Sequence, residues 1–325
     1  MPSQLTSGTW RPELEGAVRE FAATDSARRQ FIGDIVLPIQ REATKVGQFP
    51  VLCKENWRKL IDTSRAPNGA FNRGDFDWKF TNYACVENGI EEPVDNSTVA
   101  QFADVLRLEE EAAIGADYII RLRHEKAVSD AVMNITTFTA TNVAVDWDTV
   151  ATSTPLVDLD AGVNTLEDQL GVPRQALSLI LPRSKWQALR RATTVLATLQ
   201  SWSSGISGPE SIRLGVVKDY LDVKEIIVGT GSYDSADEGL TQSFSQIWPS
   251  RYGMLALLAP GEAAPRQTLC LGRTVSWTWP SSADVSIETY DSMEIDARVV
   301  RARQFTQEFI QSSFAGYLMD LDALS

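Results

Sequence analysis

Residues 98–133 have the apolar periodicity of one long helix, and this stretch constrains the fold more than any other feature of the chain. Apolar side chains recur there at steps of three and four residues, the spacing of an amphipathic helix. Charged residues one turn apart, such as Asp117 and Arg121, occupy the opposite face and stabilise a helix by about 0.2–0.5 kcal/mol per pair. At about 1.5 Å per residue the helix would extend roughly 50 Å, so other parts of the chain must pack along it. The two apolar stripes consist of Val105, Leu108, Ala112, Ala116, Ile119 and Leu122, and of Phe102, Leu106, Ala113, Ile120, Ala127 and Ala131.

The composition is that of a globular protein with enough apolar residues for a full core. The chain has 325 residues, of which 43% are hydrophobic, so its length predicts two domains or one elaborated domain. Its net charge of -13 and pI of about 4.7 argue against a protein whose function is to bind nucleic acid, because phosphate contacts require clustered Lys and Arg. No run approaches the roughly 18 apolar residues of a membrane helix, and residues 1–10 lack the features of a signal peptide.

The first 95 residues are predicted to form attachments rather than an independent domain. Residues 1–45 have a helical stretch within 13–31 and balanced charge, which indicates an arm that docks elsewhere. Two extended segments, 49–53 and 79–86, flank turn-rich sequence around Gly69, which predicts a projecting hairpin that packs on another subunit. Cys53 and Cys85 lie symmetrically about Gly69 and are placed to face each other, but three cysteines without a framework indicate a reducing compartment and argue against a disulfide.

The rest of the sequence alternates helices with strands. Residues 155–170 have a helical apolar face that ends at Gly171, and residues 225–229 form a short apolar strand. Further helices are predicted at 182–200 and 212–221. Further strands are predicted at 176–181, 254–258, 269–277, 286–290 and 297–310, followed by an apolar cluster at 314–321.

Enzyme motifs are weak in this chain. His124 is the only histidine and lies within the predicted long helix, so a surface or interface position explains it better than a catalytic triad. Gly229-Thr-Gly231 follows a strand but lacks the remaining residues of a phosphate-binding loop, which indicates a simple turn. We therefore expect no catalytic residue and no cofactor.

Two charged clusters also have structural interpretations. Asp158-Leu-Asp160-Ala-Gly162 resembles part of a calcium loop, but its glycine comes one position early and the glutamate of position twelve is absent. Carboxylates at a helix N-terminus explain it better, so no metal site is expected. Arg298, Arg301 and Arg303 form the densest basic patch of the C-terminal third and are predicted to pair with carboxylates of a neighbouring subunit rather than with DNA.

The order of the predicted elements is more informative than any single motif. An arm and a long hairpin precede a very long helix, a mixed α/β region and a returning C-terminal strand segment. Local stretches add to this pattern: Phe-Pro-Val at 49–51, Ala-Pro-Asn-Gly-Ala-Phe at 66–71, residues 157–173 before the strand 177–182, and Arg-Ala-Arg-Gln-Phe at 301–305 through 314–318. The chain resembles the major capsid proteins of tailed bacteriophages, which have the Hong Kong 97-type fold.

The resemblance implies an α+β fold and a mechanical function. It divides the chain into an N-terminal arm (1–45), an extended loop with a β-hairpin (46–96), a peripheral domain with a spine helix (97–154), a mixed α/β axial domain (155–284) and C-terminal strands that complete the peripheral domain (285–325). Copies of the chain would form hexamers and pentamers and close into an icosahedral head around double-stranded DNA, without sequence-specific binding.

The implied partners are other copies of the chain, a scaffolding protein and a portal, with a decoration protein as a further candidate. No membrane is involved, and the protein would be assembled in the host cytoplasm and reside in the virion. The residues expected to contact neighbouring subunits are Arg65, Asn68, Phe71, Arg73, Trp78, Arg121, Arg298, Arg301 and Arg303. On this interpretation Ile119→Asp prevents folding, whereas Arg121→Glu folds but weakens assembly.

Two alternatives remain open at this level. An encapsulin-like nanocompartment shell shares the fold but encloses protein cargo instead of DNA. An acidic α/β hydrolase or transferase would form a discrete oligomer with an active-site pocket, whereas a capsid protein would form shells hundreds of Å across.

Overall fold

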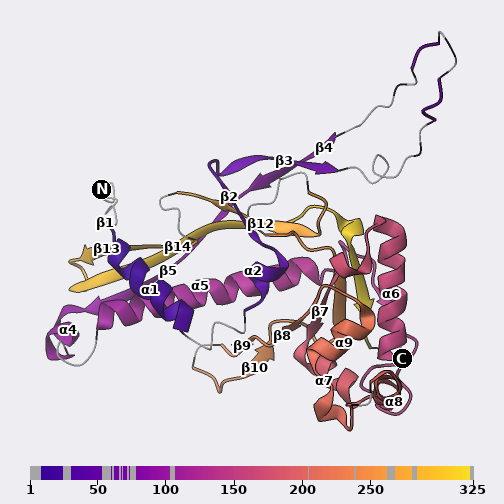
Figure 1. Ribbon diagram of the computed structural model, residues 1–325. Coiled ribbons are helices and arrows are strands. Elements are labelled where there is room, and N and C mark those ends of the chain that lie inside the picture. The colour runs from indigo at the N-terminus through magenta and orange to yellow at the C-terminus, as the bar shows by residue number, and fades with distance from the viewer. Residues whose placement is uncertain are drawn as a thin grey trace.

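A computed structural model shows an elongated α+β chain organised around two sheets (Figure 1). It describes residues 9–24, 31–52, 60, 62–65, 67, 69–71, 73, 78–102, 107–203, 205–237, 239–261, 268–279 and 284–322. No helix in these described ranges is long and apolar enough to cross a membrane.

The first sheet has six strands and is organised around β14 (Ala297–Ile310). The full length of β5 (Val86–Asp95) pairs antiparallel with β14. Along its other edge, β14 pairs first with β13 (Ser286–Ser292) and then with β12 (Gly272–Trp277). The sheet is completed by β1 (Thr9–Trp10), antiparallel to β13, and β2 (Ile39–Glu42), parallel to β12.

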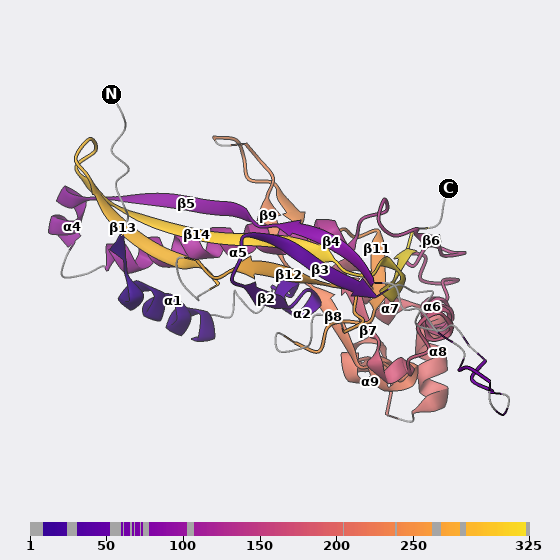
Figure 2. The same cartoon turned by 90° about the horizontal axis from the view of Figure 1, so that it is seen from above.

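One long helix, α5 (Leu108–Val132), lies along this sheet beneath β14 and β5 (Figures 1 and 2). Its N-terminal half also packs against α1 (Pro12–Thr24), through Leu14 and Val18 of α1. The short helix α2 (Gly33–Val36) lies against the C-terminal half of α5. The N-terminal arm therefore docks on the chain's own long helix.

The prediction of a single helix over 98–133 is wrong at its beginning. Residues Asn96–Phe102 form a separate helix, α4, and Arg107 has non-helical dihedral angles (φ -93°, ψ 74°), while residues 103–106 lie outside the described ranges. Asp95 accepts hydrogen bonds from the backbone N–H of Thr98 and from the hydroxyls of Ser97 and Thr98, so it caps the start of α4 rather than of α5.

The predicted apolar stripe of this helix is also partly wrong, because Ile119 is 46% exposed whereas Ile120 is buried. Each residue turns the helix by 100°, so the position after Ile119 faces the sheet instead. Ala112, Ala113 and Ala116 are buried and allow the sheet to approach closely. The same face buries the polar residues Asp117, His124, Glu125 and Ser129.

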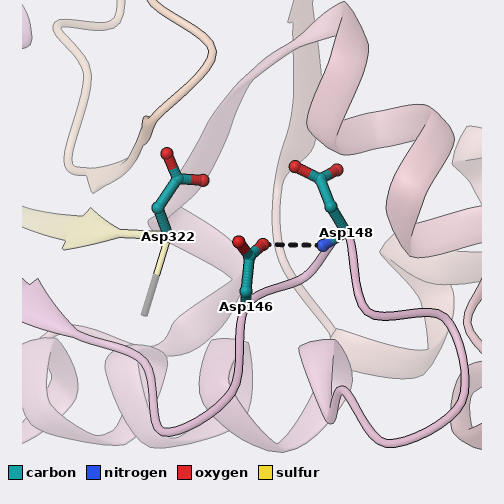
Figure 3. A group of neighbouring side chains, drawn as sticks. All are labelled: Asp146, Asp148 and Asp322. Atoms are coloured by element: carbon teal, nitrogen blue, oxygen red, sulfur yellow. Dashed lines mark hydrogen bonds between the residues drawn. The ribbon is translucent and has the colours of Figure 1, made fainter. Parts of the chain in front are cut away.

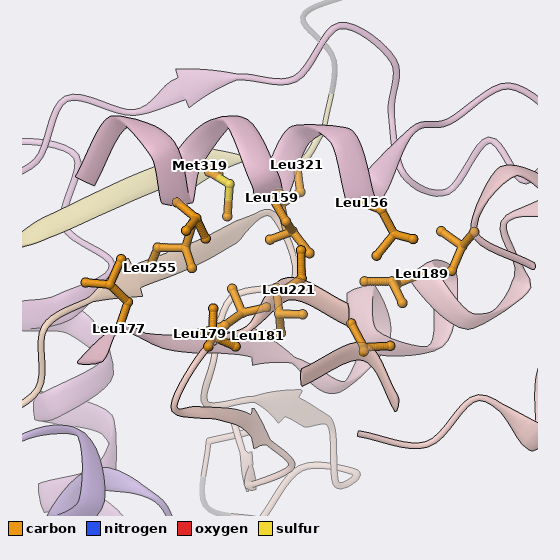
Figure 4. Close-up of a cluster of buried hydrophobic side chains, with 14 of the residues drawn as sticks. Leu156, Leu159, Leu177, Leu179, Leu181, Leu189, Leu221, Leu255, Met319 and Leu321 are labelled. Carbon is orange, nitrogen blue, oxygen red and sulfur yellow. The ribbon is translucent and has the colours of Figure 1, made fainter. Parts of the chain in front are cut away.

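The second sheet has five strands and an apolar core. Its order is β6 (Thr141–Asn142), β15 (Gly316–Asp320), β11 (Tyr252–Ala256), β7 (Ser178–Pro182) and β8 (Glu225–Gly229). Leu156 and Leu159 of α6 (Pro155–Leu170) pack against leucines of the strands and of the neighbouring helices (Figure 4). The remaining helices of this part are α7 (Arg183–Arg191), α8 (Thr193–Trp202) and α9 (Leu214–Leu221), with single 3-10 turns at Arg174–Ala176, Pro209–Ser211 and Ser313–Ala315.

Several predictions for this part are confirmed by the structure. α6 and β8 occupy the predicted residues, and Gly171 ends α6 in the left-handed conformation (φ 65°). The predicted helix 182–200 is instead two helices, because Ala192 is not helical (φ -58°, ψ 126°). Neither sheet is built from the strands of one predicted domain alone. β12 lies within the predicted axial range 155–284 but joins the six-stranded sheet, and β15 lies within the predicted peripheral range 285–325 but joins the five-stranded sheet.

A long antiparallel hairpin projects from the six-stranded sheet, formed by β3 (Val46–Leu52) and β4 (Trp78–Ala84) (Figure 1). Its root is anchored by Phe49, which is fully buried against Tyr83 and Phe309. The predicted hairpin is therefore confirmed. A second, short hairpin, β9 (Ser232–Asp234) with β10 (Phe244–Gln246), projects below α5 in Figure 1.

The hairpin register corrects the placement of the two cysteines. Val46 pairs with Ala84 and Leu52 with Trp78, and the backbone N–H of Cys85 donates to the carbonyl of Lys45. Cys85 is therefore opposite Lys45 rather than Cys53, which lies outside the described residues. The buried thiol of Cys85 points to the carbonyl of Val275, and burial raises its pKa to about 11.

Candidate intersubunit contacts

The far end of the β3–β4 hairpin presents an arginine stacked on an exposed aromatic ring. The guanidinium of Arg65 lies 4.5 Å from the ring centre of Phe71, and its Nε donates to the carbonyl of Gly69 at 2.7 Å. Phe71 is 70% exposed, and Arg73 is also exposed. Asn68 and the side chain of Trp78 lie outside the described part, although the Trp78 backbone pairs with Leu52.

The three arginines of β14 form ion pairs with carboxylates of their own chain. Arg298 contacts Glu109 of α5 at 2.9 Å and Asp291 of β13 at 3.0 Å. Arg301 contacts Glu91 of β5 at 2.6 Å. Arg303 bonds to Glu288 and lies 3.7 Å from Glu87. Within the chain these carboxylates come from β5, β13 and α5, because β14 lies between two acidic strands of the same sheet, and pairing with a neighbouring subunit stays a prediction.

The structure places Arg121 in a partly buried ion-pair cluster rather than on an open charged face. Its Nε lies 3.0 Å from Asp117, whose side chain is only 1% exposed, and its Nη1 lies 3.9 Å from Asp34 of α2. Burial lowers the pKa of Arg121, but these carboxylates outweigh that effect and raise it. Arg121→Glu would place a negative charge beside the buried carboxylate of Asp117, so the variant should be destabilised rather than fold normally.

His124 is buried, contrary to the prediction of a surface or interface position. Its Nδ1 lies 3.1 Å from Glu308 of β14, and its Nε2 lies 3.3 Å from Asp34. The two carboxylates belong to segments far apart in the sequence, which α5 brings together on one side.

Glu125 forms a second polar junction one residue further along α5. Its carboxylate accepts hydrogen bonds from the backbone N–H groups of Ile32 (3.1 Å) and Gly33 (2.6 Å) and from the indole N–H of Trp248 (2.6 Å). Burial raises the pKa of Glu125, and these three donors oppose that effect. Glu125 therefore joins the N-terminal arm to the segment that precedes β11.

Sequence reasoning missed these junctions, although the sequence contains a signal for them. Ala113, Asp117, Ile120, His124 and Val128 follow one another at steps of three and four, so two ionisable residues stand within the buried stripe. Ionisable residues are almost never fully buried unless they are paired. Two such residues in a core stripe therefore predict partners elsewhere in the chain.

Asp146, Asp148 and Asp322 are the acidic group closest to a metal-ligand arrangement in the described ranges (Figure 3). A cation of the protein already lies among them: Nζ of Lys185 is 2.7 Å from Asp148, 2.5 Å from Asp322 and 3.4 Å from Asp146. Burial lowers the pKa of Lys185, but the hydrogen bonds to Asp148 and Asp322 outweigh it and raise it. The group joins the C-terminal segment to α7 and to the loop before α6.

Of the two other motifs weighed in the sequence, only Asp158 has the helix N-terminal position predicted for it. Asp158 lies in the first turn of α6 and accepts a hydrogen bond from the indole N–H of Trp147 at 2.9 Å. Asp160 pairs with Arg174 at 3.2 Å. Gly229 ends β8, where a Cβ atom would lie 2.4 Å from the Trp248 ring, so close packing explains this glycine.

The similarities to known proteins extend over most of the chain. No protein-family model matches the chain. In sequence it is 23% identical over 295 residues to the major capsid protein of Burkholderia phage BcepMu, across 89% of this chain and 91% of the relative. A phage-related protein from Bordetella bronchiseptica RB50 has a TM-score of 0.69 at 20% identity and covers 97% of each chain. The chain resembles phage major capsid proteins in sequence and shares their fold.

The capsid-type fold also extends to more distant structures. The capsid protein of cyanophage P-SCSP1u has a TM-score of 0.59 at 11% identity, across 89% of this chain and 87% of the other. The predicted resemblance to tailed-phage major capsid proteins and the predicted α+β class are thereby confirmed. The similarity in sequence to a phage major capsid protein favours that class over an encapsulin-like shell and over a soluble enzyme.

Proposed function

We propose that this protein is a major capsid protein of a tailed phage, with the Hong Kong 97-type arrangement, that assembles with other copies into an icosahedral head around double-stranded DNA. The observation that carries the proposal is the match to a phage major capsid protein over nine-tenths of both chains, 89% and 91%. The function is then mechanical, and none of the described residues is assigned to catalysis.

The proposed domains follow the two sheets. Residues 1–45 are the arm and residues 46–96 the extended loop. The peripheral domain comprises residues 97–154 and 285–325, and we assign β12 to it as well, because β12 pairs with β14. The axial domain comprises residues 155–284 without β12, and we assign β15 to it, because β15 pairs with β11.

The hairpin end is the part of the molecule best suited to reach a neighbouring subunit. It projects from the sheet and exposes Phe71 beside Arg65, and a two-stranded hairpin is only marginally stable by itself in water. Packing on a second copy would bury the exposed ring. Arg73, Asn68 and Trp78 are proposed to contribute to the same contact.

The surfaces of β14 and α5 are proposed as secondary contacts. Arg298 is about 40% exposed at its side chain and Arg301 28%, so both retain surface for a neighbouring subunit besides their own carboxylates. The side chain of Arg121 is also 28% exposed, and only that of Arg303, at 14%, is more enclosed. Such partly exposed ion pairs direct the register of a contact more than they strengthen it.

Hexamers and pentamers of this chain, a portal and a separate scaffolding protein are the expected assembly partners, with a decoration protein as a further candidate. The acidic chain, with a net charge of -13, is suited to enclose DNA without binding it, because a lining that held phosphates would hinder packaging. Assembly would take place in the host cytoplasm and leave the protein in the virion.

Negative-stain microscopy of the expressed protein, alone and with its scaffolding protein, tests the proposal. Shells hundreds of Å across are expected. The double variant Arg65→Ala, Phe71→Ala should keep the wild-type circular dichroism spectrum but form few shells, whereas Leu240→Ala, which removes an exposed side chain elsewhere, should assemble normally. A discrete small oligomer in all conditions would overturn the proposal, and shells that hold protein cargo instead of DNA would favour the nanocompartment.

A further inference from the structure

A charge cluster around the buried His124 connects the N-terminal arm to the long helix, through the half-exposed Asp34. His124 of α5 lies between two carboxylates, Asp34 of α2 at 3.3 Å and Glu308 of β14 at 3.1 Å, and its side chain is 8% exposed. His124 is the only histidine of the chain. It therefore joins three segments that are separated by 90 residues or more in the sequence.

Charged groups on every neighbouring element face this histidine. From α5 these are Arg121, Asp117, Glu125 and Arg123, the last of which interacts electrostatically with Glu308. Asp34 of α2 and Glu308 of β14 complete the first layer, and beyond Arg121 lies Asp284, which pairs with Arg41 of β2 at 2.6 Å. A pocket of about 200 Å³, lined by Asp34, Arg121 and His124 among others, lies beside the ring.

The segment held by this cluster is well defined. Residues 31–42 comprise the approach to α2, α2 itself and β2, and we call them the strap. The strap is fixed by the Glu125 carboxylate at Ile32 and Gly33, by His124 at Asp34, and by the pairing of β2 with β12. It leads directly into β3 of the projecting hairpin, so its position determines where the hairpin begins.

We propose that the strap is a charge-locked switch, held closed by protonated His124 and loosened at its α2 turn when His124 loses its proton. The protonated imidazole of His124 is then the cation between Asp34 and Glu308. The neutral imidazole no longer provides a positive charge to these two carboxylates. The inference concerns the isolated subunit and does not depend on the proposed function.

The direction of the pH effect follows from the environment of the ring. Burial lowers the pKa of His124, but its contacts with Asp34 and Glu308 outweigh that effect and raise the pKa from 6.5 to about 9. Because the pKa is higher in the closed state, the lock is fully present below about pH 6.5 and is lost as the pH rises through about 9. Opening should therefore become roughly tenfold to a hundredfold more favourable between pH 7 and pH 9.

Two measurements on the unassembled protein test this switch. Proton NMR of the single histidine should give a pKa well above 6.5, and Glu308→Gln should move that pKa downward. In hydrogen–deuterium exchange at pH 7, the amides of Ile32 and Gly33 should exchange about tenfold to a hundredfold faster in His124→Gln than in the wild type. From pH 7 to pH 9, wild-type strap amides should accelerate beyond the increase that base catalysis gives every amide.

Lys126→Gln is the matched control, because it removes one positive charge from the same helix at an exposed pair with Asp130. Its strap amides should exchange at the wild-type rate. Should His124→Gln fail to fold, Glu308→Gln replaces it in the exchange measurement. A histidine pKa near 6.5, or strap exchange that is unchanged in the His124 and Glu308 variants, would overturn the proposal.

Discussion

The interiors of the two sheets differ in kind. Behind the five-stranded sheet, the buried side chains between α6 and the strands are almost all apolar, with Leu159 fully buried (Figure 4). Beneath the six-stranded sheet, α5 buries small alanines together with Asp117, His124 and Glu125. An apolar core tolerates rearrangement if its volume is kept, whereas a buried charge needs a partner at a set distance. We therefore expect the first region to respond to volume and the second to the loss of single partners.

The largest loss among variants that still fold is expected at the Glu125 junction. Glu125→Ala leaves the backbone N–H groups of Ile32 and Gly33 and the indole N–H of Trp248 without their acceptor. Unsatisfied buried donors cost about 1–3 kcal/mol each, so the free energy of unfolding should fall by about 3–6 kcal/mol. Urea denaturation followed by circular dichroism measures it, and a loss below about 1 kcal/mol would contradict the role given to this carboxylate.

The apolar core should give a smaller loss that depends only on volume. Leu159→Ala should lower the free energy of unfolding by about 2–5 kcal/mol, because it removes buried methyl groups and leaves a cavity. Leu159→Met keeps the volume and should lose less than about 1.5 kcal/mol. The loss of unfolding free energy in Leu159→Ala should be equal at pH 7 and pH 9. A loss that depends on pH would contradict the expected difference between the two regions.

Arg121→Glu tests the charge cluster by reversing the charge of its arginine. It replaces the cation beside Asp117 with a carboxylate that also lies near Asp34, so the free energy of unfolding should fall by about 2–4 kcal/mol. Arg123→Glu makes the same charge change at an exposed position two residues further along α5 and should lose less. Thermal unfolding of both variants measures the difference between them. Equal melting temperatures would mean that the ion pair of Arg121 with Asp117 adds nothing to stability.

The pH dependence should be confined to the polar region. His124 has a pKa of about 9 in the folded chain against 6.5 when unfolded, so its contribution to stability is lost as the pH rises toward 9. Raising the pH from 7 to 9 should lower the free energy of unfolding by about 1–2 kcal/mol in the wild type, and by clearly less in His124→Gln. Denaturant titrations at both pH values measure this difference, and parallel losses in the two proteins would argue against it.

The smallest effect is expected for Ile119→Asp. Ile119 is 46% exposed on the outer side of α5, so the substitution should change the free energy of unfolding by less than about 0.5 kcal/mol. Ile120→Asp, at the buried neighbouring position, is the contrasting variant and should prevent folding. The yield of folded protein and its melting temperature test the pair.

Local patterns in the sequence predicted the parts of the fold whose signals are local. α6 has a regular apolar face and a glycine at its end, and β8 is a short apolar run, and both lie at the predicted residues. The β3–β4 hairpin was predicted from two extended segments around a turn-rich centre. In each case the residues that determine the element are adjacent in the chain, so propensity, periodicity and turn chemistry suffice.

The tertiary structure decided the rest, because those features depend on partners that are distant in the sequence. The periodicity of the apolar residues does not indicate which side of α5 meets the sheet, since apolar residues occur around most of the helix. The sequence therefore predicts a buried Ile119 and a His124 at the surface or an interface. The carboxylates of the β14 arginines come from β5, β13 and α5, and the partners of His124 come from residues 34 and 308. Only the packed chain brings these charges within hydrogen-bond distance, and the charges that the long helix buries need such partners.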